Sequence, residues 1–245
     1  MTVSSEIRES PNHDSRNGAP VDILLLHYTG MTSAEAALDR LCDPTAKVSC
    51  HWFVHVDGRV VRLVPESERA WHAGVSSWAG EIDINARSVG IEIDNPGHEF
   101  GYRPFPDAQV EAVAGLCREI LARHPIPSGR VLAHSDVAPA RKQDPGELFP
   151  WARLASDGIG HWVEPERLTS GRRLEPGAAG PDVADLQGRL ASYGYGITPD
   201  GVYDAATVAV VTAFQRHFRP ARVDGIADVS TRRTLDRLLR ALPRR

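Results

Sequence analysis

The sequence predicts an α/β protein with a mixed central β-sheet flanked by helices, followed by a small three-helix domain at the C-terminus. Apolar strand-like runs alternate with segments of helical periodicity over the first 155 residues. Beyond them the chain becomes rich in Gly, Pro and Ser, and a repeated Asp-Gly motif follows. We expect a disordered arm at 1–20, a first domain at 21–158, a linker at 159–173 and a second domain at 174–245.

The first half of the first domain is predicted as a strand, a helix and a hairpin. Residues 21–27 are almost continuously apolar, as in a strand buried on both faces. A capping-box pattern, Thr-Ser-Ala-Glu, begins a helix over 32–41. Residues 51–56 and 59–64 flank an Asp-Gly turn and form the two strands of the hairpin.

The second half is predicted as two strands around a helix. Residues 89–94 form another central strand. Apolar residues recur at helical spacing over 107–124, and two prolines end that helix. Residues 130–134 form a short buried strand.

The C-terminal domain contains an internal repeat. The pattern Asp-Gly-Val-Tyr-Asp-x-x-Thr at 200–207 recurs as Asp-Gly-Ile-Ala-Asp-x-x-Thr at 224–231. In each copy Asp-Gly favours a turn, and the second aspartate, Asp204 or Asp228, is a predicted N-cap. A preceding helix ends at Gly194.

Composition excludes several classes of function. A net charge of −4 gives no basic footprint for nucleic acid, and no apolar run reaches the roughly 20 residues of a membrane span. The polar N-terminus does not resemble a signal peptide, so we expect a cytoplasmic protein, although removal of an export signal would leave the same pattern. Three cysteines favour reduced thiols, and a Cys42–Cys50 disulfide stays open.

Three side chains with useful chemistry lie at or near the C-terminal ends of predicted strands: His27, Glu92 and His134. Binding sites of open α/β sheets form beyond those ends. Asp144 follows His134 in the same loop, and two imidazoles with one carboxylate are a catalytic zinc set whose fourth position is left for water. We therefore predict that His27, His134 and Asp144 hold one Zn²⁺ ion.

The neighbouring residues complete the requirements of metal-assisted amide hydrolysis. Zinc makes bound water a usable nucleophile, and Glu92 could take its proton as general base and pass it to the leaving group. Lys142 could stabilise the oxyanion that develops on the attacked carbonyl. Glu92 lies in an apolar strand, and a buried carboxylate needs a partner or a task.

Each residue also has a purely structural interpretation. His27 could be a packed histidine, Asp144 a turn residue and Lys142 a solvated side chain. His51 and His55 share a strand face and form a rival ligand pair. Four further histidines are assigned to loops or helix surfaces without a special role: His13, His98, His124 and His217.

An irregular segment around Trp71 and Trp78 could stack on a sugar or peptide, or cap a core. It includes one of four motifs that carry a family resemblance. The motifs are Leu26-His27-Tyr28-Thr29, Arg69-Ala70-Trp71-His72-Ala73-Gly74, Val89-Gly90-Ile91-Glu92, and Ala-His-Ser-Asp-Val-Ala-Pro-x-Arg-Lys-x-Asp-Pro-Gly at 133–146. With them, residues 21–155 resemble zinc-dependent N-acetylmuramoyl-L-alanine amidases of the AmpD/AmiD type. Residues 174–242 resemble the peptidoglycan-binding module often appended to such enzymes, as in AmiD-like members.

The resemblance implies the same zinc ligands and the same roles for Glu92 and Lys142. The implied substrate is peptidoglycan or a muropeptide, cut between N-acetylmuramic acid (or its 1,6-anhydro form) and L-alanine. Some relatives place a catalytic tyrosine at the position of Cys50, so this chain belongs with those that use the glutamate. We further expect five residues to contact substrate: Trp71, His72, Ala73, Gly74 and Asn95.

Two alternatives remain at this point. One is a non-catalytic peptidoglycan-recognition protein, and the other is a zinc peptidase that cuts within the stem peptide. Binding-only relatives typically lack a ligand, whereas all three ligands are present here, which favours the amidase. Cytoplasmic relatives act in cell-wall recycling, which is the role we expect.

Overall fold

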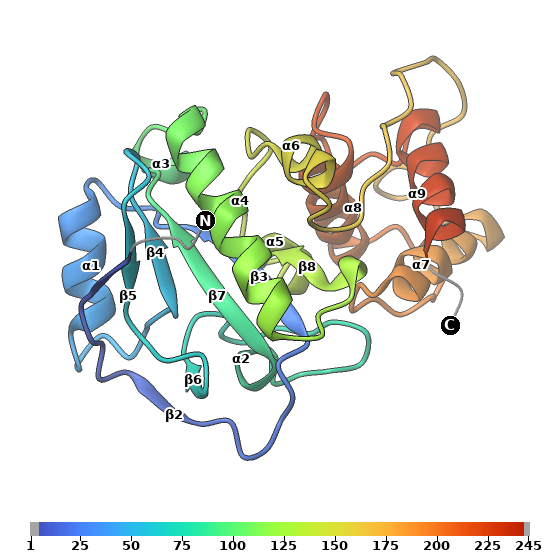
Figure 1. Ribbon diagram of the computed structural model, residues 1–245. Helices are drawn as coiled ribbons and strands as arrows, with labels where there is room; N and C mark the ends of the chain where they lie inside the picture. Colours follow the sequence, from blue (N-terminus) through green and yellow to red (C-terminus); the bar gives the residue numbers. More distant parts are fainter. Residues whose placement is uncertain (1–4, 243–245) are drawn as a thin grey trace.

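A six-stranded mixed sheet forms the centre of the N-terminal domain in the computed structural model, which describes residues 5–242 (Figure 1). The strand order is β1-β5-β4-β7-β3-β8, and only the β4–β5 pair is antiparallel. The strands of this sheet are β1 (Ser5–Ile7), β3 (Ile23–Tyr28), β4 (Trp52–Val54), β5 (Val60–Arg62), β7 (Ser88–Ile93) and β8 (Val131–Ala133). The fold class expected from the sequence is confirmed.

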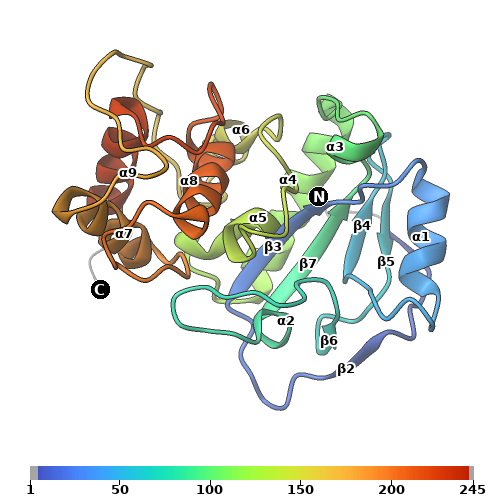
Figure 2. The same ribbon diagram turned by 180° about the vertical axis from the view of Figure 1, so that it is seen from behind.

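Two helices cover opposite faces of this sheet. The long helix α4 (Asp107–Arg123) packs on one face, where Leu24 and Leu26 of β3 join its apolar side (Figure 1). The other face carries α1 (Ala34–Cys42), which packs beside β4 and β5 (Figure 2). Ser33 caps α1 by accepting a hydrogen bond from the Ala36 N–H group, so the helix begins one residue later than the capping-box pattern starting at Thr32 predicts.

Short elements complete the first domain. They are β2 (His13–Ser15), β6 (Glu68–Ala70), α2 (Ile84–Arg87), α3 (Gly97–Phe100), a 3₁₀ turn (Ser128–Arg130), α5 (His134–Val137) and α6 (Trp151–Ser156). The three cysteines are free thiols. Within residues 5–242, no helix has the length and apolar character needed to cross a membrane.

The expectation of a disordered arm at 1–20 is wrong for the part that the structure describes. Residues 5–7 add β1 to the sheet, and residues 13–15 pair with β6. Arg16 is buried and donates hydrogen bonds to the carbonyl oxygens of Ala86 and Ser88. The polar composition of this segment does not indicate an ordered structure, because backbone pairing and one buried guanidinium hold the segment in place rather than apolar packing. Residues 1–4 lie outside the described residues.

The C-terminal domain consists of α7 (Pro181–Tyr193), α8 (Ala205–Phe218) and α9 (Val229–Ala241). Asp204 and Asp228 cap α8 and α9 through the N–H groups of the threonines three residues later, which confirms both predicted N-caps. The repeat extends to two buried glutamines. Gln187 accepts a hydrogen bond from the N–H group of the glycine in the first Asp-Gly turn, and Gln215 does so in the second.

The two domains share one apolar core. It joins Ile23, Leu25 and Leu132 of the sheet to Phe214 and Leu235 of the helical domain. Figures 1 and 2 show α8 next to α5 at the β8 edge of the sheet. The helical domain is therefore packed on the sheet rather than held only by a linker.

Candidate active site

His27, His134 and Asp144 meet at the carboxyl end of the parallel strands. His27 Nδ1 lies 2.9 Å from His134 Nδ1 and 3.1 Å from Asp144 Oδ2. The third side of this triangle, from His134 Nδ1 to Asp144 Oδ2, is 2.9 Å long. All three side chains are buried. A tetrahedral ion with bonds of about 2.0–2.1 Å holds its ligands about 3.3 Å apart, so this triangle fits the size of a zinc site.

Strand register brings the glutamate beside this triangle. His27 of β3 is paired with Glu92 of β7, and His134 directly follows β8 on the other side of β3. Side chains alternate between faces along a strand, so His27 and Glu92 both lie on the face opposite α4. The structure therefore brings together the same three strand ends that the sequence predicts to converge.

A chain of hydrogen bonds orients the His27 ring. Its Nε2 atom lies 3.0 Å from His72 Nδ1, and His72 Nε2 lies 3.3 Å from Ser88 Oγ. Ser88 donates in turn to the Ile84 carbonyl oxygen. Proton donation along this chain assigns the proton of His27 to Nε2 and leaves the Nδ1 lone pair free for a metal.

His134 is oriented in the same way. Its Nε2 group donates to the Ala73 carbonyl oxygen at 3.0 Å, which leaves Nδ1 free. The next residue, Ser135, donates its backbone N–H group to the carbonyl oxygen of Asp144 at 3.0 Å. The two ligand-bearing loops are thus joined through the backbone.

The local electrostatics suit a cation. Burial lowers the pKa of His27 to about 4, so its ring is neutral at pH 7. Burial alone would raise the pKa of Asp144, but His134 and His27 hold it well below its usual value, so this group is a carboxylate. Three lone-pair donors around one point, with one negative charge, are a donor set that zinc accepts.

Glu92 has a carboxylate oxygen without a partner. Its Oε2 atom is buried and forms no hydrogen bond with any of residues 5–242. Burial, and then the charge of Asp144, raise the pKa of Glu92 well above its usual value, against the opposing effect of Lys142. A carboxyl group whose pKa is raised holds a proton more readily than an exposed one, so it can act as an acid as well as a base.

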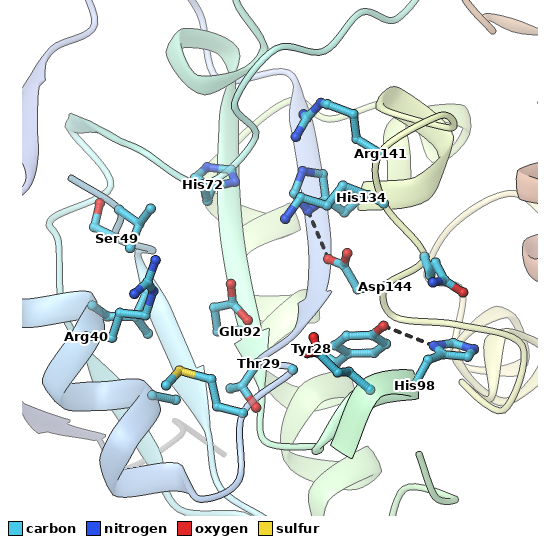
Figure 3. Close-up of a pocket in the computed structure, with 18 of the residues that line it drawn as sticks. Tyr28, Thr29, Arg40, Ser49, His72, Glu92, His98, His134, Arg141 and Asp144 are labelled. Atoms are coloured by element: carbon cyan, nitrogen blue, oxygen red, sulfur yellow. Dashed lines mark hydrogen bonds and ion pairs between the residues drawn. The ribbon is translucent and has the colours of Figure 1, made fainter. Parts of the chain in front are cut away.

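A cavity of about 430 Å³ lies over these residues. Figure 3 shows Arg40 and Ser49 on one wall, His134, Arg141 and Asp144 on the other, and Glu92 between them. Lys142 also lines the cavity. Among the predicted substrate contacts, Trp71 and His72 lie in its lining.

The other three predicted contacts lie outside that lining. Ala73 is buried and supports His134 through its carbonyl oxygen. Gly74 packs against the Arg141 guanidinium, with a positive φ of 59°. Asn95 is 1 % exposed, donates to the Arg103 carbonyl oxygen and accepts from the Gly97 N–H group, so it shapes a loop. Their positions in motifs indicated importance but could not separate contact from support.

The rival histidines have structural partners. His51 accepts a hydrogen bond from the Gly90 N–H group through Nδ1, and His55 packs edge-on against Phe53. Trp78 is 1 % exposed and packs against tyrosines of the helical domain, so it caps a core.

Three histidines that sequence reasoning assigned to the surface also have specific partners. His98 lies 3.0 Å from the Tyr28 hydroxyl, and His124 lies 2.7 Å from a Glu66 oxygen. His217 is buried against Asp136, so the expectation that it lies without a special role in a loop or on a helix surface is wrong.

Sequence reasoning also missed two residues of the cavity wall. Arg40 and Ser49 line the wall that faces the ligand triangle, far from it in the sequence. The only signal was the position of Arg40 in the last turn of an amphipathic helix, which does not distinguish it from a solvated arginine.

The fold and this site together define the class of the protein: a mixed α/β domain with a candidate metal centre at the edge of the sheet where its parallel strands have their carboxyl ends. Comparison with known proteins specifies the class. The profile of the N-acetylmuramoyl-L-alanine amidase family matches residues 17–147, and that of a putative peptidoglycan binding domain matches residues 179–235. The chain belongs to the N-acetylmuramoyl-L-alanine amidase family and is an enzyme of that kind.

Individual relatives are similar to this chain over nearly its whole length. N-acetylmuramoyl-L-alanine amidase AmiD of Escherichia coli is 38% identical over 231 residues, which cover 89% of this chain and 82% of the relative. The structure of AmiD with anhydro-N-acetylmuramic acid-L-Ala-D-gamma-Glu-L-Lys has a TM-score of 0.77, covering 95% of this chain and 92% of that one at 37% identity. AmpDh3 of Pseudomonas aeruginosa, solved with an anhydromuramic pentapeptide, has a TM-score of 0.72 at 30% identity, covering 96% and 94%.

Proposed function

We propose that this enzyme uses one zinc ion, held by His27, His134 and Asp144, to hydrolyse the amide bond between N-acetylmuramic acid and the L-alanine of a stem peptide. The observation that carries the proposal is the triangle of three lone-pair atoms within 3.1 Å of one another, beside a carboxyl group with an oxygen that has no hydrogen-bond partner in residues 5–242. The 1,6-anhydro form of the sugar is included, because the bound molecules of both related structures contain it.

Glu92 and Lys142 have different roles in the proposed reaction. Zinc, when bound, lowers the pKa of water and polarises a carbonyl group. Glu92 accepts the proton of the attacking water and delivers it to the amide nitrogen as the carbon–nitrogen bond breaks. Lys142 offers a positive charge to the carbonyl oxygen as that oxygen becomes negative. The products are the lactyl carboxylate of the sugar and a stem peptide with a free amino group.

Arg40 is suited to bind the peptide part of the substrate. It lines the cavity from α1, and its guanidinium forms no ion pair or side-chain hydrogen bond with the other described residues. A glutamate that is linked through its γ-carboxyl group, as in the ligand of the related AmiD structure, keeps a free α-carboxylate. We propose that Arg40 pairs with that carboxylate.

A digest of one defined muropeptide tests the proposed reaction. Mass spectrometry should find a free stem peptide and an intact sugar, and this product should disappear in EDTA and return with added zinc. A shortened stem peptide would instead indicate a peptidase, and an unchanged substrate would indicate a recognition protein. Full activity of a metal-free sample in EDTA would contradict the zinc site.

A parallel digest tests which form of the substrate the enzyme prefers. We propose that the module at 174–245 carries the enzyme to polymeric wall, while the expected role in recycling requires action on soluble anhydro-muropeptides. Intact sacculi and anhydro-muropeptide are digested side by side with equal enzyme. Preference for the soluble fragment supports recycling, and preference for sacculi supports wall degradation.

A further inference from the structure

A buried carboxylate connects the helical domain to the loop that carries His134. Asp136 lies two residues after His134 in α5 and is fully buried. Its Oδ2 atom accepts hydrogen bonds from the Ala133 N–H group at 2.8 Å and from His217 Nδ1 at 2.6 Å. Its Oδ1 atom accepts from the Tyr195 hydroxyl at 2.6 Å. Two of these three donors belong to the helical domain.

A second connection reaches the loop that carries Asp144. Arg216, next to His217 on α8, donates from Nη2 to Gln143 Oε1 at 2.9 Å. Its Nε atom also lies 3.6 Å from a Glu147 carboxylate oxygen. Gln143 directly precedes Asp144, so α8 touches both ligand-bearing loops.

Aromatic packing fixes the donors in place. The ring of His217 stacks on Trp151 of the first domain at a centroid distance of 3.7 Å. The ring of Tyr195 packs edge-on against Trp78 at 5.0 Å, and the neighbouring Ala79 N–H group donates to the carbonyl oxygen of Gly194. These contacts hold the donors of Asp136 between the two domains.

We infer that the helical domain braces the metal site, with Tyr195, His217 and Arg216 acting as positioning residues for His134 and Asp144. The inference rests on the proposed function, because the group that the ligands hold is the proposed zinc ion. The helix α5 has only four residues, too few to fix its own geometry. A buried carboxylate that loses a donor must find another, and the turn that carries His134 then shifts.

A matched pair of tyrosine variants tests the inference in the full-length protein. Tyr195→Phe removes the hydroxyl that donates to Asp136. Tyr193→Phe removes a hydroxyl from the same aromatic cluster, but that hydroxyl contacts His161 instead. Zinc affinity is measured by competition with a chromophoric chelator, and the rate of zinc loss is measured in EDTA. Tyr195 acts on His134 through Asp136, and a hydrogen bond to a buried charged group is worth about a factor of 10 or more, so we expect zinc affinity to fall by up to about 10-fold for Tyr195→Phe and by less than about twofold for Tyr193→Phe.

A second pair of variants tests the connection to the loop that carries Asp144. Arg216→Gln removes the contacts to Gln143 and Glu147, whereas Arg237→Gln removes an ion pair between α9 and Glu166, in the segment that precedes the helical domain. Only Arg216→Gln should speed zinc loss. Thermal unfolding of the metal-free variants separates positioning from folding, because a merely structural role predicts that zinc affinity falls only in proportion to stability.

The outcomes separate this inference from the proposed function. Wild-type protein that binds one zinc ion, with Tyr195→Phe and Arg216→Gln indistinguishable from their controls, would overturn the brace and leave the proposed function standing. Wild-type protein that binds no zinc would overturn both. If Tyr195→Phe unfolds, the variant Arg216→Gln, at a partly buried residue, decides the question alone.

Discussion

At the scale of single residues, the carboxyl group of Glu92 combines a raised pKa with a buried oxygen that has no partner among the described residues. Substitution Glu92→Gln keeps the size of the side chain but removes its capacity to carry a proton. We expect kcat to fall by about 10²- to 10⁴-fold, as for loss of a general base, while zinc stoichiometry stays at one. The release of stem peptide and the metal content of the same sample are the two measurements.

His27→Ala is the contrasting variant, because it removes a proposed ligand. It should lose both zinc and turnover. Near-normal activity of Glu92→Gln would show that another group moves the proton.

Arg40 gives a second prediction at this scale. Arg40→Gln should raise KM by about 10-fold for a muropeptide with a free α-carboxylate on its γ-linked glutamate, the size of a lost charge-assisted hydrogen bond. Amidating that carboxylate should raise KM for the wild type and leave the variant unchanged. Arg118→Gln, on the helix that covers the opposite face, is the matched control. Equal discrimination by wild type and Arg40→Gln would exclude the pairing.

At the scale of elements, the close approach between β7 and the segment that contains His72 depends on a glycine. A Cβ atom at Gly90 would lie 2.6 Å from the His72 ring. Gly90→Ala must therefore displace the histidine that supports His27. We expect the free energy of unfolding to fall by about 1–3 kcal/mol, as for an overpacked core. Zinc affinity should fall as well, because His72 orients a proposed ligand.

Gly188→Ala is the control for this substitution. Gly188 lies inside α7, and a Cβ atom there would meet nothing within 4 Å. Because glycine weakens a helix interior, this variant should gain up to about 1 kcal/mol of stability. Urea unfolding of the metal-free proteins measures both changes. A Gly90→Ala variant as stable as wild type, with unchanged zinc affinity, would contradict the steric argument.

At the scale of the whole molecule, His51 ties together the N-terminal segment, β6 and β7. Its Nε2 atom lies 2.9 Å from Arg16 Nη2 and 3.1 Å from the Glu68 carbonyl oxygen, while Nδ1 accepts from Gly90. Burial, and then the charge of Arg16, lower the pKa of His51 to about 3. The unfolded chain therefore binds a proton at this residue between about pH 6.5 and pH 3, where the folded chain does not.

This difference sets the sign of a pH dependence. The contribution of neutral His51 is fully present above pH 6.5 and is lost as the pH falls toward 3. Between pH 8 and pH 5, wild type should lose about 2 kcal/mol more stability than His51→Gln, since each unit of pKa is worth about 1.4 kcal/mol. Urea unfolding at both pH values measures the two losses, and other histidines cancel in the comparison. Equal losses would show that His51 does not contribute.

Much of the fold was predictable because it depends on local patterns. The apolar run before His27, the Asp-Gly turn of the hairpin and the N-caps Asp204 and Asp228 each carry their own signal in neighbouring residues. The N-terminal strands were missed because their order comes from pairing with residues about 55 positions away. Local composition has no access to such pairing.

The candidate ligand set was predictable for a different reason. His27, Glu92 and His134 each lie within one residue of the end of an apolar strand, and parallel strands bring their carboxyl ends to one edge. The supporting groups were not predictable in this way. Asn95 and Ala73 lie in or near motifs yet do not line the cavity, whereas Arg40 lies in an ordinary helix and does line it.

The sequence by itself determined the class of sheet, the residues that meet at its edge and the amidase family, because periodicity and motif chemistry are properties of short stretches of chain. Only the tertiary structure decided which groups surround those residues. The contact of Asp136 with His217 spans 81 positions, and the shared core makes the helical domain part of the site's support. Burial and hydrogen-bond partners over such separations arise from packing, and packing exists only once the whole chain has folded.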